Sequence, residues 1–247
     1  MLLEVESLTK AFGGLVAVSR VSFRVGSGEV VGLLGPNASG KTTILNLIAG
    51  ALRPDAGQVR LDARDITLLP ASARARLGIA RTFQLVRALP KLSVLDNVLI
   101  GRLYGRDGTG LEAARAESLH LLDSVGLRDK GQLRASQLTL TDQKRMELAR
   151  ALATRPKVLL LDEPLGGLNP TEVRTAVAQL RQVRTSGVTV VLVEHNVRAV
   201  RALCDHLIMF NYGEIVVEGG PDDVLAHPAV IEAYLGKSSA SNLAAFS

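Results

Sequence analysis

The pattern of apolar and polar residues near the start of the chain predicts two β-strands. At 21–25 the two kinds of residue alternate with a period of two, as in a strand with one buried face. At 29–34 nearly every residue is apolar, as in a strand covered on both faces. A glycine-rich turn at 35–40 then leads into a predicted helix at about 41–49, which Gly50 closes. A strand, a tight turn and a helix in this order predict an α/β protein.

The middle of the chain, from about residue 90 to residue 153, has a different character. It is rich in Leu, Ala, Arg and Glu, and its apolar residues recur with helical spacing at 111–122 and at 144–153. Along the second run, Met146, Ala149 and Ala153 share one helix face. The pattern predicts a mostly helical insertion.

Strand patterns return after this insertion. Apolar runs at 158–161 and 188–193 predict buried strands, with a helix between them at about 171–184. The runs 207–210 and 214–217 predict a hairpin around the turn residues Asn211, Tyr212 and Gly213. The whole pattern therefore predicts an α/β core with a helical excursion in its middle.

Composition and charge narrow the range of functions. Hydrophobic residues make up 47% of the 247 residues and charged residues 21%, which is typical of a globular protein. The formal net charge of +5 is small and the charges are scattered, so we predict no nucleic-acid partner. Cys204 is the single cysteine, which excludes an internal disulfide, and the apolar runs are too short to cross a bilayer. Any role at a membrane is therefore expected to come through a partner protein.

The turn after the second strand carries the strongest chemical motif. Residues 35–42 match the pattern G-x-x-x-x-G-K-[ST] between a buried strand and a helix. Backbone N–H groups in such a loop, with the helix N-terminus, form a positively polarised nest for phosphates. We expect Lys41 to reach the β- and γ-phosphates and the Thr42 hydroxyl to bind Mg²⁺. The residues expected to bind ATP here are Gly35, Pro36, Asn37, Ala38, Ser39, Gly40, Lys41, Thr42 and Thr43.

A phosphate loop of this kind needs an acidic group for its metal ion. Asp162 and Glu163 stand at the end of the buried strand predicted at 158–161. In P-loop NTPases such an aspartate holds Mg²⁺. Because neighbouring strand residues point to opposite sides, Asp162 and Glu163 can serve different purposes. We expect Asp162 to serve the metal and Glu163 to orient or activate the water that attacks the γ-phosphate.

These motifs and several shorter ones follow one another as they do in the ATP-binding-cassette (ABC) ATPases, which the chain resembles over nearly its whole length. Residues 81–84 resemble the glutamine loop of that family, which implies that Gln84 touches Mg²⁺ and senses a transmembrane partner. Residues 167–169 resemble the D-loop, which crosses between two subunits. His195 resembles the switch histidine that contacts the γ-phosphate, so it joins Lys41 and Glu163 as an expected catalytic residue.

The resemblance also implies an adenine site and a division of the chain. Phe12, ahead of Val18, matches the aromatic residue that stacks on adenine, and both are expected in the ATP site. The fold class is α/β, a P-loop NTPase core of the ABC ATPase type with an N-terminal antiparallel β subdomain and an inserted helical subdomain. The expected parts of this single domain, 1–237, are a core at 1–88 and 154–218, a helical subdomain at 89–153 and a C-terminal extension at 219–237, followed by a flexible tail at 238–247.

One motif departs from the family pattern. The signature, typically Leu-Ser-Gly-Gly-Gln before a helix, closes in this family on the ATP of the opposite subunit. The residues expected to make this contact here are Thr139, Leu140, Thr141 and Asp142. The Thr139 hydroxyl can replace that of serine as a donor, whereas Leu140 and Thr141 put side chains where glycines let the backbone approach phosphate. The side chains of Leu140 and Thr141 put in doubt the contact between the signature and the ATP of the second subunit. They do not affect the binding of ATP to the phosphate loop of the same subunit.

Finer resemblance points to a class of transporter. Residues 81–84, 167–170, 194–196 and the ending 227–236 resemble the ATPases of branched-chain amino-acid importers. This implies ATP and Mg²⁺ as cofactors and a head-to-tail dimer with a second ATPase subunit, identical or homologous. It also implies transmembrane permease subunits, an indirect periplasmic or extracellular solute-binding protein, and a peripheral position on the cytoplasmic face of the inner (plasma) membrane.

Other functions stay open on the sequence alone. The chain could be the ATPase of a urea or amide importer or of a lipopolysaccharide exporter, since the subunit never touches the solute. The altered signature also fits a regulatory subunit that binds ATP, hydrolyses it weakly and works beside a competent homologue. A soluble cassette ATPase of DNA repair or translation is disfavoured, because neither a second cassette nor a coiled-coil arm is visible. A P-loop kinase or GTPase is disfavoured because no guanine-reading Asn-Lys-x-Asp stretch is present.

Overall fold

The computed structural model describes residues 1–235, so the tail predicted at 238–247 lies outside the described residues. The chain forms two compact units, one made of residues 1–69 with the chain from residue 189 onward, the other of residues 70–188. The domain boundaries that the sequence suggested stay predictions. Across residues 1–235, no helix combines the length and the apolar character needed to cross a lipid bilayer.

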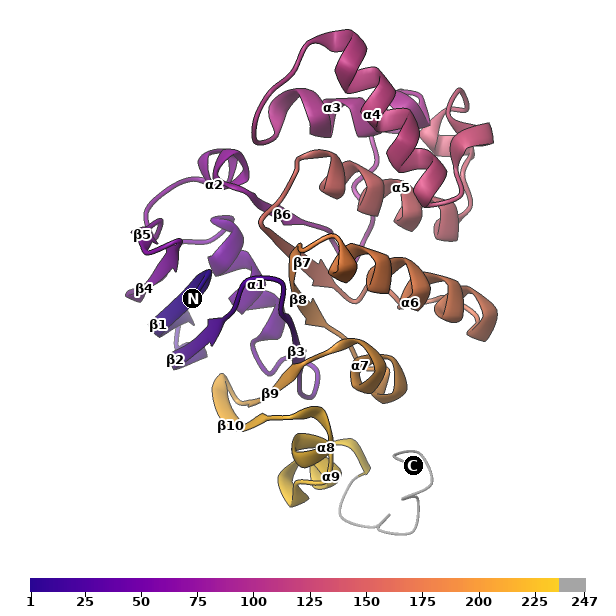
Figure 1. Cartoon of the computed structure of the whole chain (residues 1–247). Coiled ribbons are helices and arrows are strands. Elements are labelled where there is room, and N and C mark those ends of the chain that lie inside the picture. Colours follow the sequence, from indigo (N-terminus) through magenta and orange to yellow (C-terminus); the bar gives the residue numbers. More distant parts are fainter. Residues whose placement is uncertain (236–247) are drawn as a thin grey trace. The chain divides into compact units, whose positions relative to one another are not determined.

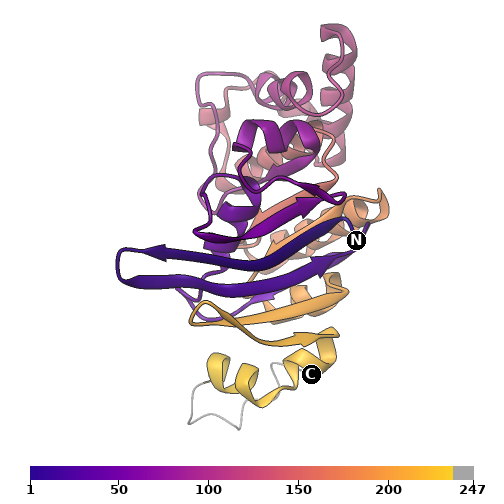
Figure 2. The ribbon, with the colours of Figure 1, turned by 90° about the vertical axis from the view of Figure 1, so that its left-hand side faces the viewer.

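The first unit contains a four-stranded antiparallel sheet with the strand order β2-β1-β4-β5 (Figure 1). Its strands are β1 (Leu3–Phe12), β2 (Leu15–Val25), β4 (Ala56–Leu61) and β5 (Arg64–Asp65). The strands β1 and β2 form one long hairpin, whose indigo ribbons stand out in Figure 2. Along β2, Val21, Phe23 and Val25 are buried and the residues between them are exposed, as the alternation predicts. The antiparallel N-terminal sheet is therefore confirmed.

Parallel strands form the other sheet layer of the first unit. Here β3 (Val30–Leu34) lies between β8 (Thr189–Val193) and β9 (His206–Asn211) and is parallel to both. Every residue of β3 and β8 is buried, which confirms the two fully covered strands. The strand β10 (Glu214–Gly219) pairs antiparallel with β9, which confirms the hairpin around Tyr212.

Four helices of the described chain belong to this unit. They are α1 (Lys41–Ala49), α7 (Val197–Leu203), α8 (Pro221–Leu225) and α9 (Pro228–Leu235). The helix α1 ends where the sequence predicts: Gly50 is left-handed, with φ of 74°, and its N–H donates to the carbonyls of Asn46 and Leu47. The glycine closes the helix because it adopts this angle without a steric penalty.

The second unit joins two parallel strands to a group of helices. Its strands are β6 (Ile79–Arg81) and β7 (Val158–Asp162). Its α-helices are α2 (Ala71–Leu77), α3 (Val94–Tyr104), α4 (Leu111–Ser124), α5 (Leu140–Ala153) and α6 (Pro170–Thr185), with short 3₁₀ turns at Arg128–Lys130 and Ala135–Gln137. The helical character predicted for 111–122, 144–153 and 171–184 is confirmed.

An apolar core holds α3, α4 and α5 together in this unit (Figure 1). Met146, Ala149 and Ala153 all face this core, which confirms that they share one side of α5. The other members are Val94, Leu95, Val98, Leu122, Val125, Leu127, Ala135 and Leu138. Leu138, just before α5, and Met146, within it, both belong to this core, so α5 is anchored to α3 and α4 from its N-terminal part.

Candidate functional site

The phosphate loop of the first unit is shaped by two glycines that no other residue can replace. Gly35 has φ of 144°, and a Cβ there would lie 2.2 Å from the carbonyl oxygen of Phe210. Gly40 has φ of 105°, and a Cβ there would lie 2.4 Å from the carbonyl oxygen of Ala17. The backbones of β9 and β2 therefore press against both ends of the loop, and only glycine fits.

Lys41 closes this loop from the first turn of α1. Its side chain is buried, and Nζ donates hydrogen bonds to the carbonyls of Gly35 (2.8 Å) and Pro36 (2.7 Å) and to Oγ of Ser39 (3.3 Å). The helix N-terminus has no side-chain cap, because Gly40 stands at the N-cap position. A buried ammonium next to uncapped helix N–H groups fits a phosphate chain, so the residues present suit the predicted nucleotide.

Ala38, which replaces a glycine common in this loop, is left-handed with φ of 62°. An L-residue in this conformation costs about 1–2 kcal/mol relative to the right-handed region. Its side chain is exposed, so the methyl group displaces no neighbour. Ala38 thus strains the backbone without filling the loop.

The predicted switch histidine lies at the same sheet edge as the phosphate loop. The strands β3 and β8 are parallel and Leu33 pairs with Val193, so the loop and His195 both follow directly at their carboxyl ends. The buried Glu194 accepts hydrogen bonds from the N–H groups of His195 (3.1 Å) and Asn196 (3.4 Å). The Glu194 carboxylate thus stabilises the turn that follows β8. The half-buried imidazole of His195 lies at the carboxyl edge of the parallel strands, where ligands bind in sheets of this kind.

The two residues expected at the adenine differ in exposure. Phe12, at the end of β1, is 48% exposed, and Nζ of Lys10 lies 5.7 Å from its ring centroid. Val18 is fully buried, because β2 is irregular near Arg20, whose φ is 47°, and the irregularity buries Val18 as well as Val21. The placement of both residues in the ATP site stays a prediction, and Phe12 is the one of the two whose side chain is exposed.

An ion pair fixes the strand end that carries Phe12. The carboxylate of Asp55 accepts hydrogen bonds from Nζ of Lys10 (2.7 Å) and from the N–H of Ala11 (2.7 Å). The bond from Lys10, followed by the one from Ala11, lowers the pKa of Asp55 below its ordinary value. The end of β1 is thus tied to the loop before β4.

In the second unit, Asp162 forms a buried ion pair with a residue to which the sequence assigned no function. The strands β6 and β7 are parallel, so Arg81 and Asp162 come to the same edge. The guanidinium Nη2 of Arg81 lies 2.9 Å from Oδ2 of Asp162, and the two side chains are 7% and 2% exposed. Burial, opposed by the bond to Asp162, lowers the pKa of Arg81. Such a pair fixes the Asp162 carboxylate in one orientation.

Glu163 adopts a conformation that strand alternation does not describe. The strand β7 ends at Asp162, and Glu163 follows it with a left-handed φ of 49°. The expectation that the two acids diverge as neighbouring strand residues is therefore wrong, because the chain has already left the strand. They still differ, since Asp162 is buried and Glu163 is half-buried. Nε2 of Gln84 donates a hydrogen bond to Oε2 of Glu163 over 2.8 Å, which brings the glutamine loop to this acid.

The signature residues form the N-terminus of α5. Thr139 is the N-cap, and its hydroxyl accepts a hydrogen bond from the N–H of Asp142. Leu140 is 53% exposed, and the Thr141 hydroxyl donates to Oε1 of Glu172 on α6 over 2.8 Å. The Asp142 carboxylate is buried against Lys130 and Arg145. What Asp142 could present to a nucleotide of another subunit is therefore its backbone, not its carboxylate.

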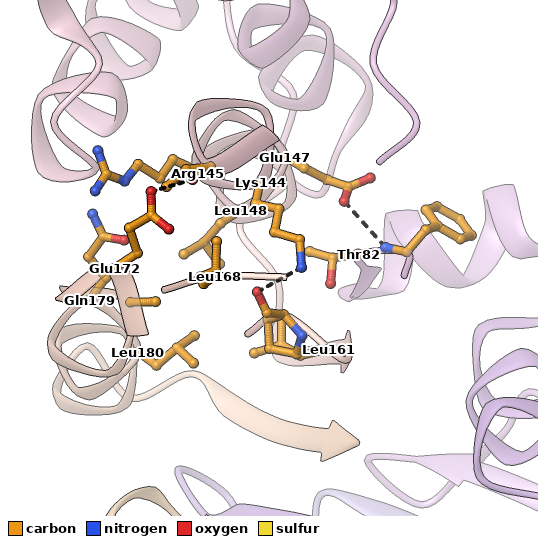
Figure 3. A pocket seen from close by; sticks show the side chains of 14 residues that line it. Thr82, Lys144, Arg145, Glu147, Leu148, Leu161, Leu168, Glu172, Gln179 and Leu180 are labelled. Carbon is orange, nitrogen blue, oxygen red and sulfur yellow. Dashed lines mark hydrogen bonds between the residues drawn. The ribbon is translucent and has the colours of Figure 1, made fainter. Parts of the chain in front are cut away.

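Lys144 and Glu147, one turn apart on α5, are polar residues whose contacts the sequence did not reveal (Figure 3). Nζ of Lys144 donates hydrogen bonds to the carbonyls of Glu163 (3.3 Å), Pro164 (3.2 Å) and Gly166 (2.5 Å). Glu147 is 3% exposed, and burial raises its pKa above the ordinary value. In the sequence, only the position of Glu147 next to the apolar residues of a helix face could have indicated that its side chain is buried.

A cavity lies beside these residues, lined by α5, α6 and the turn after β7 (Figure 3). Its interior holds about 40 Å³, and Leu148, Leu161 and Leu180 form part of its wall. This space suits a water molecule and is far too small for a nucleotide. The candidate site is therefore the loop at 35–42 with the edge residues, not this cavity.

The residues present also fit the predicted metal ion. Magnesium is held by one or two protein groups together with phosphate oxygens and water, not by a cage of protein side chains. Within residues 1–235, no group of three or more His, Cys, Asp or Glu side chains gathers as a metal site. The exposed Thr42 hydroxyl and the Asp162 carboxylate are hard oxygen donors of the right kind.

Comparisons with known proteins agree with this chemistry. The profile of the ABC transporter family matches residues 18–166, and a profile described as "Branched-chain amino acid ATP-binding cassette transporter" matches residues 214–240. The high-affinity branched-chain amino acid transport ATP-binding protein BraF of Pseudomonas aeruginosa is 37% identical, over 96% of this chain and 98% of that protein. The lipopolysaccharide export system ATP-binding protein LptB of Escherichia coli is also 37% identical, over 95% of this chain and 97% of that protein.

A solved structure resembles the whole fold. The ADP conformation of MJ1267, an ATP-binding cassette of an ABC transporter, superposes with a TM-score of 0.85 at 31% identity, covering 96% of this chain and 99% of that one. The same family is indicated by the profile that matches more than half of the chain, by the two relatives and by this structure. The chain belongs to the ABC transporter family and has the fold of its ATP-binding cassettes.

Proposed function

We propose that this protein hydrolyses ATP to drive a transporter that imports branched-chain or related amino acids. The observation that carries the ATPase is the phosphate loop, where Gly35 and Gly40 shape the backbone around the buried Lys41. A loop of this shape before a helix binds the phosphates of a nucleotide. The solute class rests on the resemblance to BraF and on the family profile at 214–240.

The chemistry follows from the properties of each side chain. Lys41 and the N–H groups at the start of α1 neutralise charge on the phosphates, and this electrostatic stabilisation supplies most of the catalysis in phosphoryl transfer. Thr42, Gln84 and Asp162 would hold Mg²⁺, which would neutralise negative charge on the phosphates. Glu163 orients the attacking water, and Gln84 holds its carboxylate in place. His195 contacts the γ-phosphate from the edge of β8.

The subunit works in a dimer at the membrane. Two copies, or this chain and a homologue, enclose two Mg·ATP between the phosphate loop of one subunit and residues 139–142 of the other. Hydrolysis opens the dimer, and the groove beside Gln84 passes this motion to transmembrane permease subunits on the cytoplasmic face. A periplasmic or extracellular solute-binding protein delivers the solute to the permease.

A regulatory ATP-binding subunit is the second candidate, and the signature favours it. Leu140 exposes half of its side chain at the first position of α5, where the family has a glycine. The extra bulk can keep the helix from approaching a nucleotide closely. In that case the chain binds ATP, hydrolyses it weakly and depends on a competent homologue.

The deciding experiment measures ATP hydrolysis by the purified chain over a range of protein concentrations, with Glu163→Gln as control. We expect turnover to rise more than linearly with concentration, as dimerisation requires, and to fall about 100-fold or more in the control. Tight binding of Mg·ATP without turnover would favour the regulatory subunit. Turnover that survives in Glu163→Gln would remove Glu163 from the mechanism.

The solute class needs a separate experiment. The chain would be purified with the permease subunits it binds and reconstituted in vesicles together with the solute-binding protein. Uptake of labelled leucine and of labelled urea would then be measured in parallel. ATP-driven leucine uptake supports the proposal. Uptake of urea alone, or of neither solute, contradicts it.

A further inference from the structure

Glu147 is a buried carboxylate in a helix whose neighbouring positions build an apolar core. It is 3% exposed, between Met146 and Leu148, which are also buried. Burying a carboxylate is costly unless it accepts hydrogen bonds or pairs with a cation. If packing were the only requirement, an apolar residue would serve at this position. The hydrogen bonds of the Glu147 carboxylate therefore explain why a glutamate is present.

The carboxylate of Glu147 is directed at the backbone of the glutamine loop. Its Oε2 accepts a hydrogen bond from the N–H of Phe83 (3.4 Å), and Oε1 accepts one from the N–H of Arg87 (3.2 Å). Figure 3 draws the first of these bonds as a dashed line from the labelled Glu147. Nη2 of Arg150 lies 3.4 Å from Oε1 and balances the charge. The two N–H groups bracket Gln84, so both ends of the loop are held by one side chain.

The aromatic ring of this loop is fixed as well. The Phe83 ring lies between two guanidinium groups, with its centroid 5.1 Å from Cζ of Arg81 and 4.2 Å from Cζ of Arg87. A guanidinium group over an aromatic face is attracted by the electrons of the ring. The segment around Gln84 is thus tied through its backbone to α5 and through its side chains to the end of β6.

We propose that Glu147 is a positioning residue that holds Gln84 against the catalytic carboxylate. The connection runs from Glu147 to the N–H groups of Phe83 and Arg87, and from Gln84 to Oε2 of Glu163 over 2.8 Å. It rests on the proposed hydrolytic function, and it adds a residue outside the family motifs found in the sequence. Because Thr139 is the N-cap of α5, the same helix joins the glutamine loop to the signature.

The chemistry requires a carboxylate at this position. Both of its oxygens are acceptors, so it can serve two N–H groups at once. Glutamine has nearly the same shape, but one oxygen becomes an NH₂ donor that faces an N–H donor. Glu147→Gln should therefore release one end of the loop while the packing of α5 stays unchanged.

The first test is a double-mutant cycle on ATP hydrolysis with Glu147→Gln and Gln84→Ala. We expect Glu147→Gln to lower kcat about 10- to 100-fold, as a displaced catalytic group does, and to leave the Kd for ATP without Mg²⁺ unchanged. In the Gln84→Ala background the same substitution should change kcat less than twofold, because Glu147 acts through Gln84. Glu112→Gln, at an exposed position of α4, removes the same charge and should have no effect.

Two results of this cycle would overturn the proposal. One is wild-type turnover in Glu147→Gln. The other is an equal loss in both backgrounds, which is the result expected if Glu147 only stabilises the fold. Thermal unfolding of each variant separates a loss of folded protein from a loss of turnover.

A second measurement needs no variant and no activity. In the wild-type chain, hydrogen exchange should be slower at the amides of Phe83 and Arg87 than at those of Gln84 and Leu85 between them. Equal exchange across this segment would contradict the two bonds to Glu147 even if no Glu147 variant folds. If the wild-type chain binds ATP without hydrolysing it, the proposed hydrolysis fails, and exchange still decides whether Glu147 holds the loop.

Discussion

The side-chain amide of Gln84 donates a hydrogen bond to the carboxylate of Glu163 over 2.8 Å, although the two residues are 79 positions apart in the chain. Gln84 follows β6 and Glu163 follows β7, and these strands are parallel neighbours. The bond therefore depends on strand pairing, not on local sequence. It joins the segment expected to sense a membrane partner to the acid expected to orient water.

From this bond we predict that Gln84→Ala lowers kcat for ATP hydrolysis about 10- to 100-fold, because Glu163 loses a group that fixes its direction. The Kd for ATP measured without Mg²⁺ should change little, since Gln84 is proposed to contact the metal ion and not the phosphate loop. Steady-state turnover and binding of a fluorescent nucleotide give the two values. Gln132→Ala, at an exposed loop position, is the control, and an equal effect of both substitutions would contradict the role of Gln84.

The buried pair of Arg81 and Asp162 leads to a prediction about stability. In Arg81→Met the Asp162 carboxylate, 2% exposed, loses its guanidinium partner. Breaking a buried ion pair by removing one member costs about 3–5 kcal/mol, so we expect the free energy of unfolding in urea to fall by about 3 kcal/mol.

The control for this prediction is an exposed pair of the same kind. Arg128 and Asp123 lie 3.6 Å apart with side chains 62% and 55% exposed, so Arg128→Met should cost less than about 1 kcal/mol. A loss in Arg81→Met no larger than in this control would mean that the buried pair contributes nothing to the fold.

Motifs and periodicity predicted the part of the site that is local in sequence. The phosphate loop needs glycines at both ends of one short turn, and the sequence pattern at 35–42 has a glycine at each of these positions. The strands β3, β7 and β8 are almost entirely apolar, which marked them as buried and placed Asp162 and His195 at strand ends. Helix α5 and its face with Met146 followed from the 3.6-residue period.

Contacts between distant segments could not be predicted in this way. Arg81 reaches Asp162 across 81 positions, and Glu147 reaches Phe83 across 64, through pairing and packing that leave no periodic signal. The left-handed turn at Glu163 was also hidden, because glutamate seldom marks such an angle as glycine does. The burial of Val18 was hidden as well, because the irregularity in β2 near Arg20 breaks the alternation of the strand.

The helix after the D-loop gives a prediction about capping. Asn169 is the N-cap of α6, and its side chain accepts hydrogen bonds from the N–H groups of Thr171 and Glu172, both over 3.0 Å. Asn169→Ala removes this acceptor and should lower the free energy of unfolding by about 1 kcal/mol. Asn169→Asp keeps an acceptor oxygen and should stay within about 0.5 kcal/mol of the wild type. Equal losses in both variants, measured by urea unfolding, would mean that the cap is not the cause.

The last prediction concerns pH and rests on the buried Arg102. Its guanidinium is 2% exposed, and Nε lies 2.5 Å from Oε2 of Glu117, while Nη2 of Arg155 lies 2.9 Å from Oε1. The hydrogen bond from Arg102 is the main cause that lowers the pKa of Glu117 below its ordinary value of 4.5. The folded chain therefore binds this proton less tightly than the unfolded chain. Glu117 stabilises the fold above that ordinary value and loses this contribution as the pH falls through the lowered pKa.

We therefore expect the wild type to be more stable than Glu117→Gln at neutral pH, and the difference to shrink when the pH falls below about 4.5. Urea unfolding of both proteins from about pH 7 to about pH 3 measures this difference. Glu112→Gln on the same helix shows the effect of removing a charge at an exposed position. A difference that stays constant down to the lowest pH would show that the charge of Glu117 does not stabilise the fold, and that Arg102 is held by its other contact, the carbonyl of Asp107 at 2.9 Å.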